Sequence, residues 1–255
     1  AGSEGTLWWG SYNDRARRLG KSSLLSRCAR TDTCPKVIET LGSAEFWGLR
    51  LSPGLVGTDA RSDIALPGNV RRYYFPSTAH GGSNGKGFLS KGDPVQGTCL
   101  LAGNPNPSRY LLRVAQRALI DWVVKDAPPP ESRYPLLQRE ELAAPDRRSM
   151  GFPAIPGAPL PDNMLNRLPD HDVGPDFRYN DVSGVVSRQP PAILRTIPML
   201  VPKTDPDGNE QADLVLELRG GLGKDADEHS HGDGADEVDE EGGGREAVRQ
   251  AADGA

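Results

Sequence analysis

Hydrophobic and polar positions predict two short strands in the first half of the chain. Lys36–Leu41 is rich in β-branched residues and lies between Pro35 and Gly42, a pattern typical of a buried strand. Val70–Phe75 is a second short run of strand length, between Asn69 and Pro76, and it contains two tyrosines and a phenylalanine. Each run therefore predicts one strand of a buried sheet.

A helix is predicted from Ser108, a plausible N-cap, to about Lys125. Its apolar residues recur at helical spacing and are expected to pack on the sheet: Leu111, Leu112, Ala115, Ala118, Leu119, Trp122 and Val123. The three prolines at 128–130 stop the helix because proline lacks the N–H that a helix needs.

The periodic pattern fades after residue 127. Residues 128–206 hold 16 of the 23 prolines, which indicates extended chain laid over a surface, or a linker. Residues 220–255 carry 11 acidic and 3 basic residues with nine glycines, so this tail is expected to be disordered. The predicted regions are 1–127 for the folded domain, 128–219 for a Pro-rich extension and 220–255 for the tail.

Composition and charge exclude two classes of protein. The net charge of −5 combines −8 in the tail with +3 in the other 219 residues. That body has no stripe of Lys and Arg, so nucleic acid is not an expected partner. No apolar run reaches the roughly 18 residues of a membrane-spanning helix, so no membrane span is expected.

An acid and a histidine, the two kinds of side chain that cooperate in proton transfer, follow the predicted strands. Glu45 comes shortly after the first strand, and His80 follows the second at a similar distance. Ligands of open parallel sheets bind at the carboxyl ends of the strands. An acid and a histidine that meet there form a pair in which the carboxylate orients the imidazole.

Alternatives to this pair remain open at the level of sequence. A lone histidine is more often structural, and a glutamate after a strand is often solvated. Glu39 within the first strand, and Asp59 and Asp63 between the strands, compete with Glu45 as the partner of His80.

The cysteines and tail histidines give weaker signals. Cys28 and Cys34 close a short loop and are either a disulfide or two reduced thiols, and Cys99 has no obvious partner. The tail segment Glu228–His231 is more typical of a solvated acidic tail than of a metal site. We therefore assign no metal and no cofactor.

Several separate motifs, spread from about Glu4 to Asp213, resemble the C-terminal half of bacterial alpha/beta hydrolase domain-containing proteins. In the first half they are Ser23–Cys28, Thr33–Val37, Ser43–Trp47, Leu66–Arg71, Ser77–Gly81, Asp121–Val124 and Pro128–Pro135. In the Pro-rich region they are Phe152–Gly157 and Leu200–Asn209, which resemble the extension of that family.

The resemblance implies an α/β fold whose eight-stranded sheet ends with the two strands predicted above. His80 matches the catalytic histidine after the last strand, and Glu45 the carboxylate after the preceding strand. The nucleophilic serine is expected in a Gly-x-Ser elbow before Ala1, so the half that bears the nucleophile is absent from this chain. The acidic tail departs from the family pattern, and a reading-frame shift is one explanation.

The first functional hypothesis is therefore a serine-type ester hydrolase to which this chain supplies the acid and the base, acting on a small ester-like molecule. Alone, the chain is expected to be inactive. The second hypothesis is a non-catalytic truncated or frame-shifted product, or a binding module on the same half-fold. The sequence leaves the substrate, the compartment and the oligomeric state open.

Overall fold

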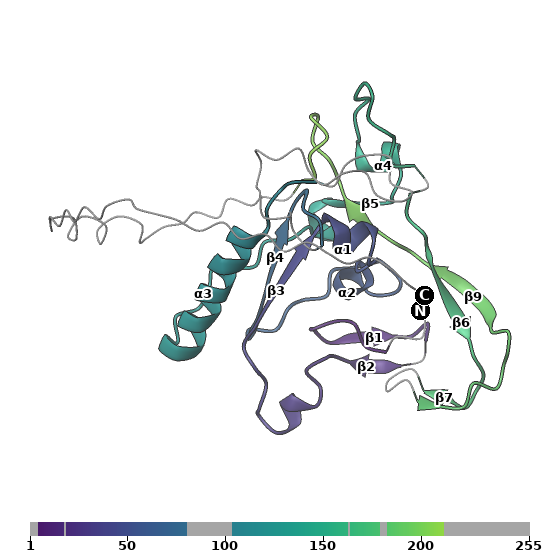
Figure 1. Cartoon of the computed structure of the whole chain (residues 1–255). Helices are drawn as coiled ribbons and strands as arrows, with labels where there is room; N and C mark the ends of the chain where they lie inside the picture. The colour runs from purple at the N-terminus through teal and green to yellow at the C-terminus, as the bar shows by residue number, and fades with distance from the viewer. Residues whose placement is uncertain (1–4, 18, 81–103, 163, 179–182, 212–255) are drawn as a thin grey trace, which may run out of the picture. The chain divides into compact units, whose positions relative to one another are not determined.

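A parallel pair of strands, β3 (Val37–Gly42) and β4 (Val70–Phe75), lies at the centre of the described structure (Figure 1). The structure is a computed structural model and describes residues 5–17, 19–80, 104–162, 164–178 and 183–211. Gly42 pairs with Phe75, so both strands end at the same edge of the sheet. The predicted bounds of the second strand are confirmed, and those of the first are shifted by one residue.

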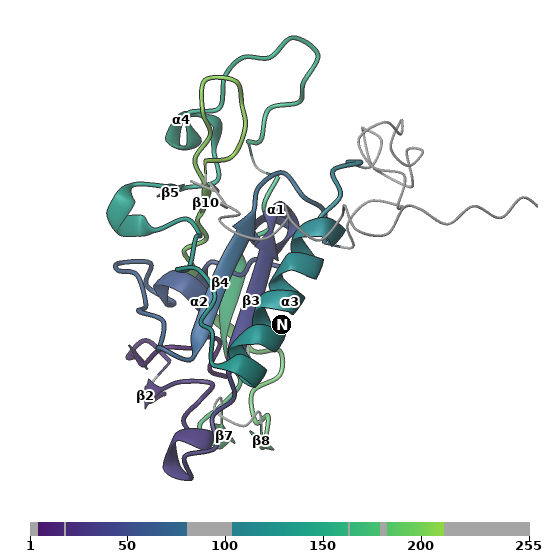
Figure 2. The ribbon, with the colours of Figure 1, turned by 90° about the vertical axis from the view of Figure 1, so that its left-hand side faces the viewer.

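Three helices accompany this pair. The helix α1 (Ser43–Trp47) follows β3 without a loop, and α2 (Pro53–Val56) comes next in the chain. The long helix α3 (Arg109–Lys125) lies along β3 (Figure 2).

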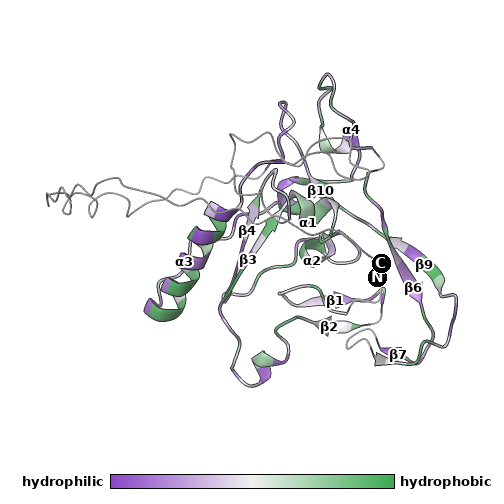
Figure 3. Cartoon of the chain, viewed as in Figure 1, coloured by the Kyte–Doolittle hydropathy of each residue, from purple (hydrophilic) through white to green (hydrophobic). Residues whose placement is uncertain are grey.

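The predicted extent of α3 is confirmed, but its apolar face is narrower than predicted. Trp122 is buried, and Leu111, Ala115, Ala118 and Leu119 are half-buried. Leu112 and Val123 are exposed, and Figure 3 shows hydrophobic and hydrophilic residues interspersed along this helix. Ser108 is the N-cap residue, as predicted, but its side chain makes no capping hydrogen bond.

The N-terminal segment forms a small antiparallel hairpin before the central strands. It consists of β1 (Tyr12–Asp14) and β2 (Gly20–Ser22), followed by the short 3-10 helix η1 (Cys28–Arg30). Cys28 and Cys34 are joined by a disulfide, which decides between the two alternatives that the sequence left open.

The Pro-rich region consists of short elements separated by irregular chain. They are η2 (Leu137–Arg139), β5 (Leu142–Ala143), α4 (Arg147–Met150), β6 (Leu168–Asp172), β7 (Phe177–Arg178), β8 (Ser183–Gly184), β9 (Ala192–Ile197) and β10 (Val201–Pro202). The strands pair antiparallel as β5–β10, β6–β9 and β7–β8. Near residue 133 the chain also runs parallel to β4, since Arg133 bonds to both Arg72 and Tyr74 through backbone groups.

Residues from both halves of the described chain form one hydrophobic core. The strands and short helices of the first half contribute Leu41, Phe46, Leu55, Val56 and Tyr74. The Pro-rich region contributes Leu142, Met150, Leu165, Leu168, Ile197, Met199 and Val201. The Pro-rich region therefore packs against the β3–β4 pair instead of forming a separate linker. The acidic tail predicted for residues 220–255 lies outside the described residues.

Candidate active site

Glu45 and His80, predicted from the two strand ends, are in direct contact. His80 Nδ1 lies 2.5 Å from Glu45 Oε1. Because a carboxylate can only accept a hydrogen bond, Nδ1 carries the hydrogen in this contact. The Glu45 side chain is 12% exposed and the His80 side chain is 70% exposed, so the pair lies at the surface with its carboxylate on the inside.

Local helix geometry fixes the position of Glu45. Glu45 is the third residue of α1, and its Oε2 accepts a hydrogen bond of 2.5 Å from the backbone N–H of Gly42, the N-cap residue. This is the half of a capping box that the third residue of a helix supplies, and glycine has no side chain for the other half. One oxygen of Glu45 therefore anchors the side chain on its own helix, and the other faces His80.

Close packing at Gly42 brings the two strand ends together. A Cβ atom at residue 42 would lie 2.3 Å from Thr78 Oγ1 and 3.0 Å from Glu45 Oε2. Thr78 Oγ1 donates a hydrogen bond of 2.8 Å to Phe75 O, and Thr78 O accepts one from the N–H of Ala44. The segment that leads to His80 is thus held against the start of α1.

We predict that Gly42→Ala separates the Glu45 and His80 segments. The added methyl group collides with Thr78, so we expect a loss of about 1–3 kcal/mol in the free energy of unfolding, typical of overpacking. Urea denaturation measures this loss. Gly68→Ala is the matched control, because a Cβ at residue 68 meets no atom within 4 Å. Equal losses in the two variants would show that the space at Gly42 has no special role.

The three competing acids have other partners or positions. Glu39 pairs with Arg72 Nε at 2.5 Å. Asp63 accepts the backbone N–H groups of Leu137 and Gln138 at the start of η2. Asp59 is exposed. Of the four acids that the sequence offered, the structure brings Glu45 to His80.

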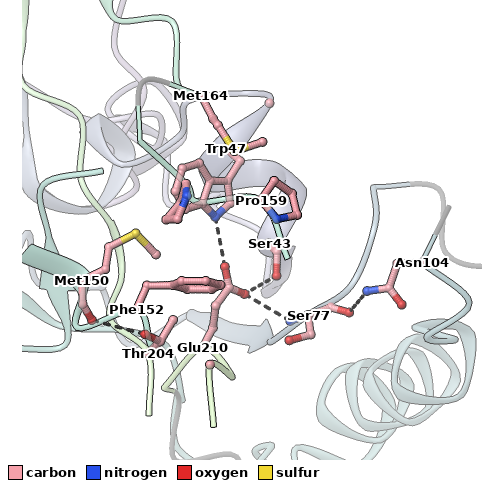
Figure 4. A pocket seen from close by; sticks show the side chains of 13 residues that line it. Ser43, Trp47, Ser77, Asn104, Met150, Phe152, Pro159, Met164, Thr204 and Glu210 are labelled. Carbon is pink, nitrogen blue, oxygen red and sulfur yellow. Dashed lines mark hydrogen bonds between the residues drawn. The ribbon is translucent and has the colours of Figure 1, made fainter. Parts of the chain in front are cut away.

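Glu210 is a residue of this region that the sequence did not indicate. Its Oε2 accepts hydrogen bonds from the Ser43 hydroxyl, the Tyr74 hydroxyl and, at 3.1 Å, the backbone N–H of Ser77. Its Oε1 accepts one from Trp47 Nε1 at 3.1 Å. Figure 4 shows this carboxylate between Trp47, Ser43 and Ser77. No local pattern marks Glu210, because its partners lie more than 130 residues earlier in the chain.

The charge of Glu210 affects the neighbouring phenol. Burial, and then the Glu210 carboxylate, raise the pKa of Tyr74 well above its usual value. The Tyr74 hydroxyl therefore keeps its proton and remains a donor to Glu210 at any pH near neutrality.

An apolar cavity of about 540 Å³ lies beside Glu210 (Figure 4). Its polar groups are Ser43, Ser77, Asn104, Thr204 and Glu210. The remaining lining residues are Trp47, Gly48, Met150, Phe152, Pro159, Pro161, Met164 and Gly208. A cavity of this volume, with apolar walls and a few convergent polar groups, is typical of a small-molecule site.

Comparison with known proteins identifies the family. The family model described as "Alpha/beta hydrolase domain" matches residues 5–209. The chain belongs to the alpha/beta hydrolase domain family. Neither a curated protein nor a solved structure matches the sequence.

The family raises the question of the nucleophile, for which the sequence offers one local match. Alpha/beta hydrolases carry the nucleophilic serine in a Gly-x-Ser-x-Gly elbow between a strand and a helix. The segment Gly81–Gly85 fits this pattern with Ser83 at its centre. Ser83 is therefore an alternative to a nucleophile encoded before Ala1. It lies outside the described residues, as do Cys99 and the tail histidines.

The described part of this hydrolase-family chain contains neither a candidate metal cluster nor a candidate membrane span. There, no group of three or more His, Cys, Asp or Glu side chains is arranged to hold a metal ion. Nor does any helix of that part have the length and apolar character needed to cross a membrane.

Proposed function

We propose that this chain supplies the carboxylate and the base of a Ser-Glu-His triad in a serine-type hydrolase that acts on a small ester or similar acyl substrate. The contact of His80 Nδ1 with Glu45 Oε1, at the carboxyl ends of two parallel strands, is the observation that carries this proposal. Membership of the alpha/beta hydrolase domain family supports it.

The geometry of the pair supports specific roles for both side chains. Since Glu45 accepts the hydrogen bond from Nδ1–H, Nε2 is the ring nitrogen left for proton transfer. The ring is exposed, so Nε2 has access to a reacting group. His80 would accept the proton of a serine hydroxyl as it attacks the acyl carbon, and return it to the leaving group. Glu45 would fix the tautomer and stabilise the imidazolium.

In this function the nucleophile would lie in an elbow encoded before Ala1, and residues 1–127 would be the C-terminal portion of the hydrolase domain. Residues 128–219 are then an extension packed on that portion, and 220–255 a disordered tail.

A second candidate is a non-catalytic binding module on the same fold. The cavity favours it, because apolar side chains and a few polar groups that include Glu210 line the cavity, whereas Glu45 and His80 are not among the lining residues. A module of this kind would bind a small molecule without acyl transfer.

One measurement tests where the nucleophile lies, and a second distinguishes the two candidates. For this chain alone, we expect no hydrolysis of a short-chain 4-nitrophenyl ester above buffer and no serine labelled by a fluorophosphonate. Labelling at Ser83, lost in both Ser83→Ala and His80→Ala, would place the nucleophile inside this chain and overturn the upstream placement.

The coding sequence before Ala1 is the second measurement. An in-frame Gly-x-Ser-x-Gly elbow between a strand and a helix is expected. In the protein that includes it, His80→Ala and Glu45→Gln should each reduce kcat by about 10²–10⁴-fold. An active protein that keeps its kcat in both variants would overturn the triad. If no elbow precedes Ala1 and Ser83 is not labelled, the binding module is left.

A further inference from the structure

The carboxylate of Glu210 bonds to both segments that carry the proposed pair. On one side its partners are Ser43 and Trp47, the first and last residues of α1, which carries Glu45. On the other side its partner is the N–H of Ser77, three residues before His80. Tyr74, in β4, donates to the same oxygen as Ser43 and Ser77.

The contact of Glu210 with Ser77 lies at a strained point of the backbone. Ser77 has φ of 54°, a left-handed conformation that non-glycine residues adopt at a cost and that tends to occur at functional sites. The Glu210 carboxylate accepts a hydrogen bond from the backbone N–H of Ser77. The side-chain amides of Asn104 and Asn106 donate to the backbone carbonyl oxygen of Ser77 at 2.7 and 2.9 Å. This conformation sets the direction in which the chain leaves β4 towards His80.

We propose that Glu210 is a positioning residue that holds Glu45 and His80 in register through α1 and Ser77. The inference rests on the function proposed above, and it assigns a role at the site to a residue of the Pro-rich extension. A carboxylate suits four donors, because both of its oxygens only accept and its hydrogen bonds are charge-assisted. Glutamine has one accepting oxygen, so its amide N–H₂ would face at least one of the four donors.

The tautomer of His80 reports directly on the pair. Long-range ¹H–¹⁵N NMR of the full chain, at about pH 9 where histidine rings are generally neutral, shows which ring nitrogen carries the hydrogen. In the wild type we expect the Nδ1–H form to predominate, and in Glu45→Ala the Nε2–H form. A His80→Gln spectrum assigns the signals.

Glu210→Gln is expected to lower the ratio of the Nδ1–H form to the Nε2–H form by about three- to tenfold, the equivalent of one ordinary hydrogen bond. Ser43→Ala, which removes a single donor from Glu210, should cause a smaller change in the same direction. If Glu210→Gln fails to fold, Ser43→Ala tests the inference in its place. The matched control is Glu131→Gln, since the Glu131 side chain is largely exposed and forms a long ion pair of 3.9 Å with Arg71.

The outcomes separate this inference from the proposed function. If Glu45→Ala changes the tautomer ratio but Glu210→Gln and Ser43→Ala do not, Glu210 only anchors the extension and the inference is overturned. An equal change in Glu131→Gln would also overturn it, because the effect would not be specific to Glu210. If Glu45→Ala leaves the ratio unchanged, the Glu45–His80 pair does not exist in solution and the proposed function fails with it.

Discussion

Ile197→Ala is expected to lower the free energy of unfolding by about 2–5 kcal/mol, whereas Ile193→Ala in the same strand should change it by less than about 1 kcal/mol. Both residues belong to β9, but Ile197 is 2% exposed and Ile193 is 65% exposed. Truncation of Ile197 leaves a cavity in the core shared with Leu41, Phe46 and Tyr74. The same truncation at Ile193 removes side-chain atoms that already face solvent.

Urea denaturation monitored by tryptophan fluorescence measures both losses on one scale. The pair of variants compares the same chemical change at two positions of one strand, so secondary-structure propensity largely cancels. Small and equal losses would mean that the Pro-rich region is not part of the cooperative core. In that case, residues such as Met199 and Val201 would also be tolerant of truncation.

The strands and the helix of the first half were predictable because their signals are local. Val70–Phe75 is a run of strand length, rich in aromatic residues, that is followed by Pro76, and the structure gives β4 the same bounds. The prolines after Ala127 mark the end of α3 for the same reason. Leu112 and Val123 fit the predicted buried face but are exposed, because helical spacing gives the direction of an apolar face and not the width of the surface that covers it.

The packing of the Pro-rich region could not be predicted from periodicity. Its elements are two to six residues long, too short for a helical or strand period to emerge. One signal was present, since Ile197, Met199 and Val201 alternate with other residues and all three are buried. Only tertiary contacts decide that such a short alternation belongs to a core.

In the candidate site, Glu45 and His80 could be predicted from the sequence, and Glu210 could not. Glu45 and His80 follow the two strands at similar distances, and parallel pairing places both strand ends at one edge. That Glu45 lies on a helix that begins directly after β3, and not in a loop, depends on the hydrogen bond of its Oε2 to Gly42. Glu210 reaches this edge only because the extension folds back over it, which no local pattern reveals.

Trp122→Ala is expected to lower the free energy of unfolding by about 3–5 kcal/mol, because it removes the one buried side chain among the described residues of α3. Trp122 is 5% exposed, and its ring centre lies 5.6 Å from Lys36 Nζ and 5.2 Å from Arg71 Cζ. Lys36 Nζ also donates to the backbone oxygen of Trp122 and to Asp126, both at 2.6 Å, where a cation at a helix C-terminus is favourable. The indole ring therefore links α3 to the beginnings of both central strands.

Ile120→Ala on the same helix is the control, since Ile120 is 55% exposed and its truncation should cost less than about 1 kcal/mol. Trp122→Phe should fall between the two alanine variants, because a phenyl ring fills part of the space and keeps an aromatic face for the two cations. Thermal unfolding followed by circular dichroism ranks the three variants. If Trp122→Ala melts at the wild-type temperature, α3 does not contribute to the core, and the placement of this helix on β3 is wrong.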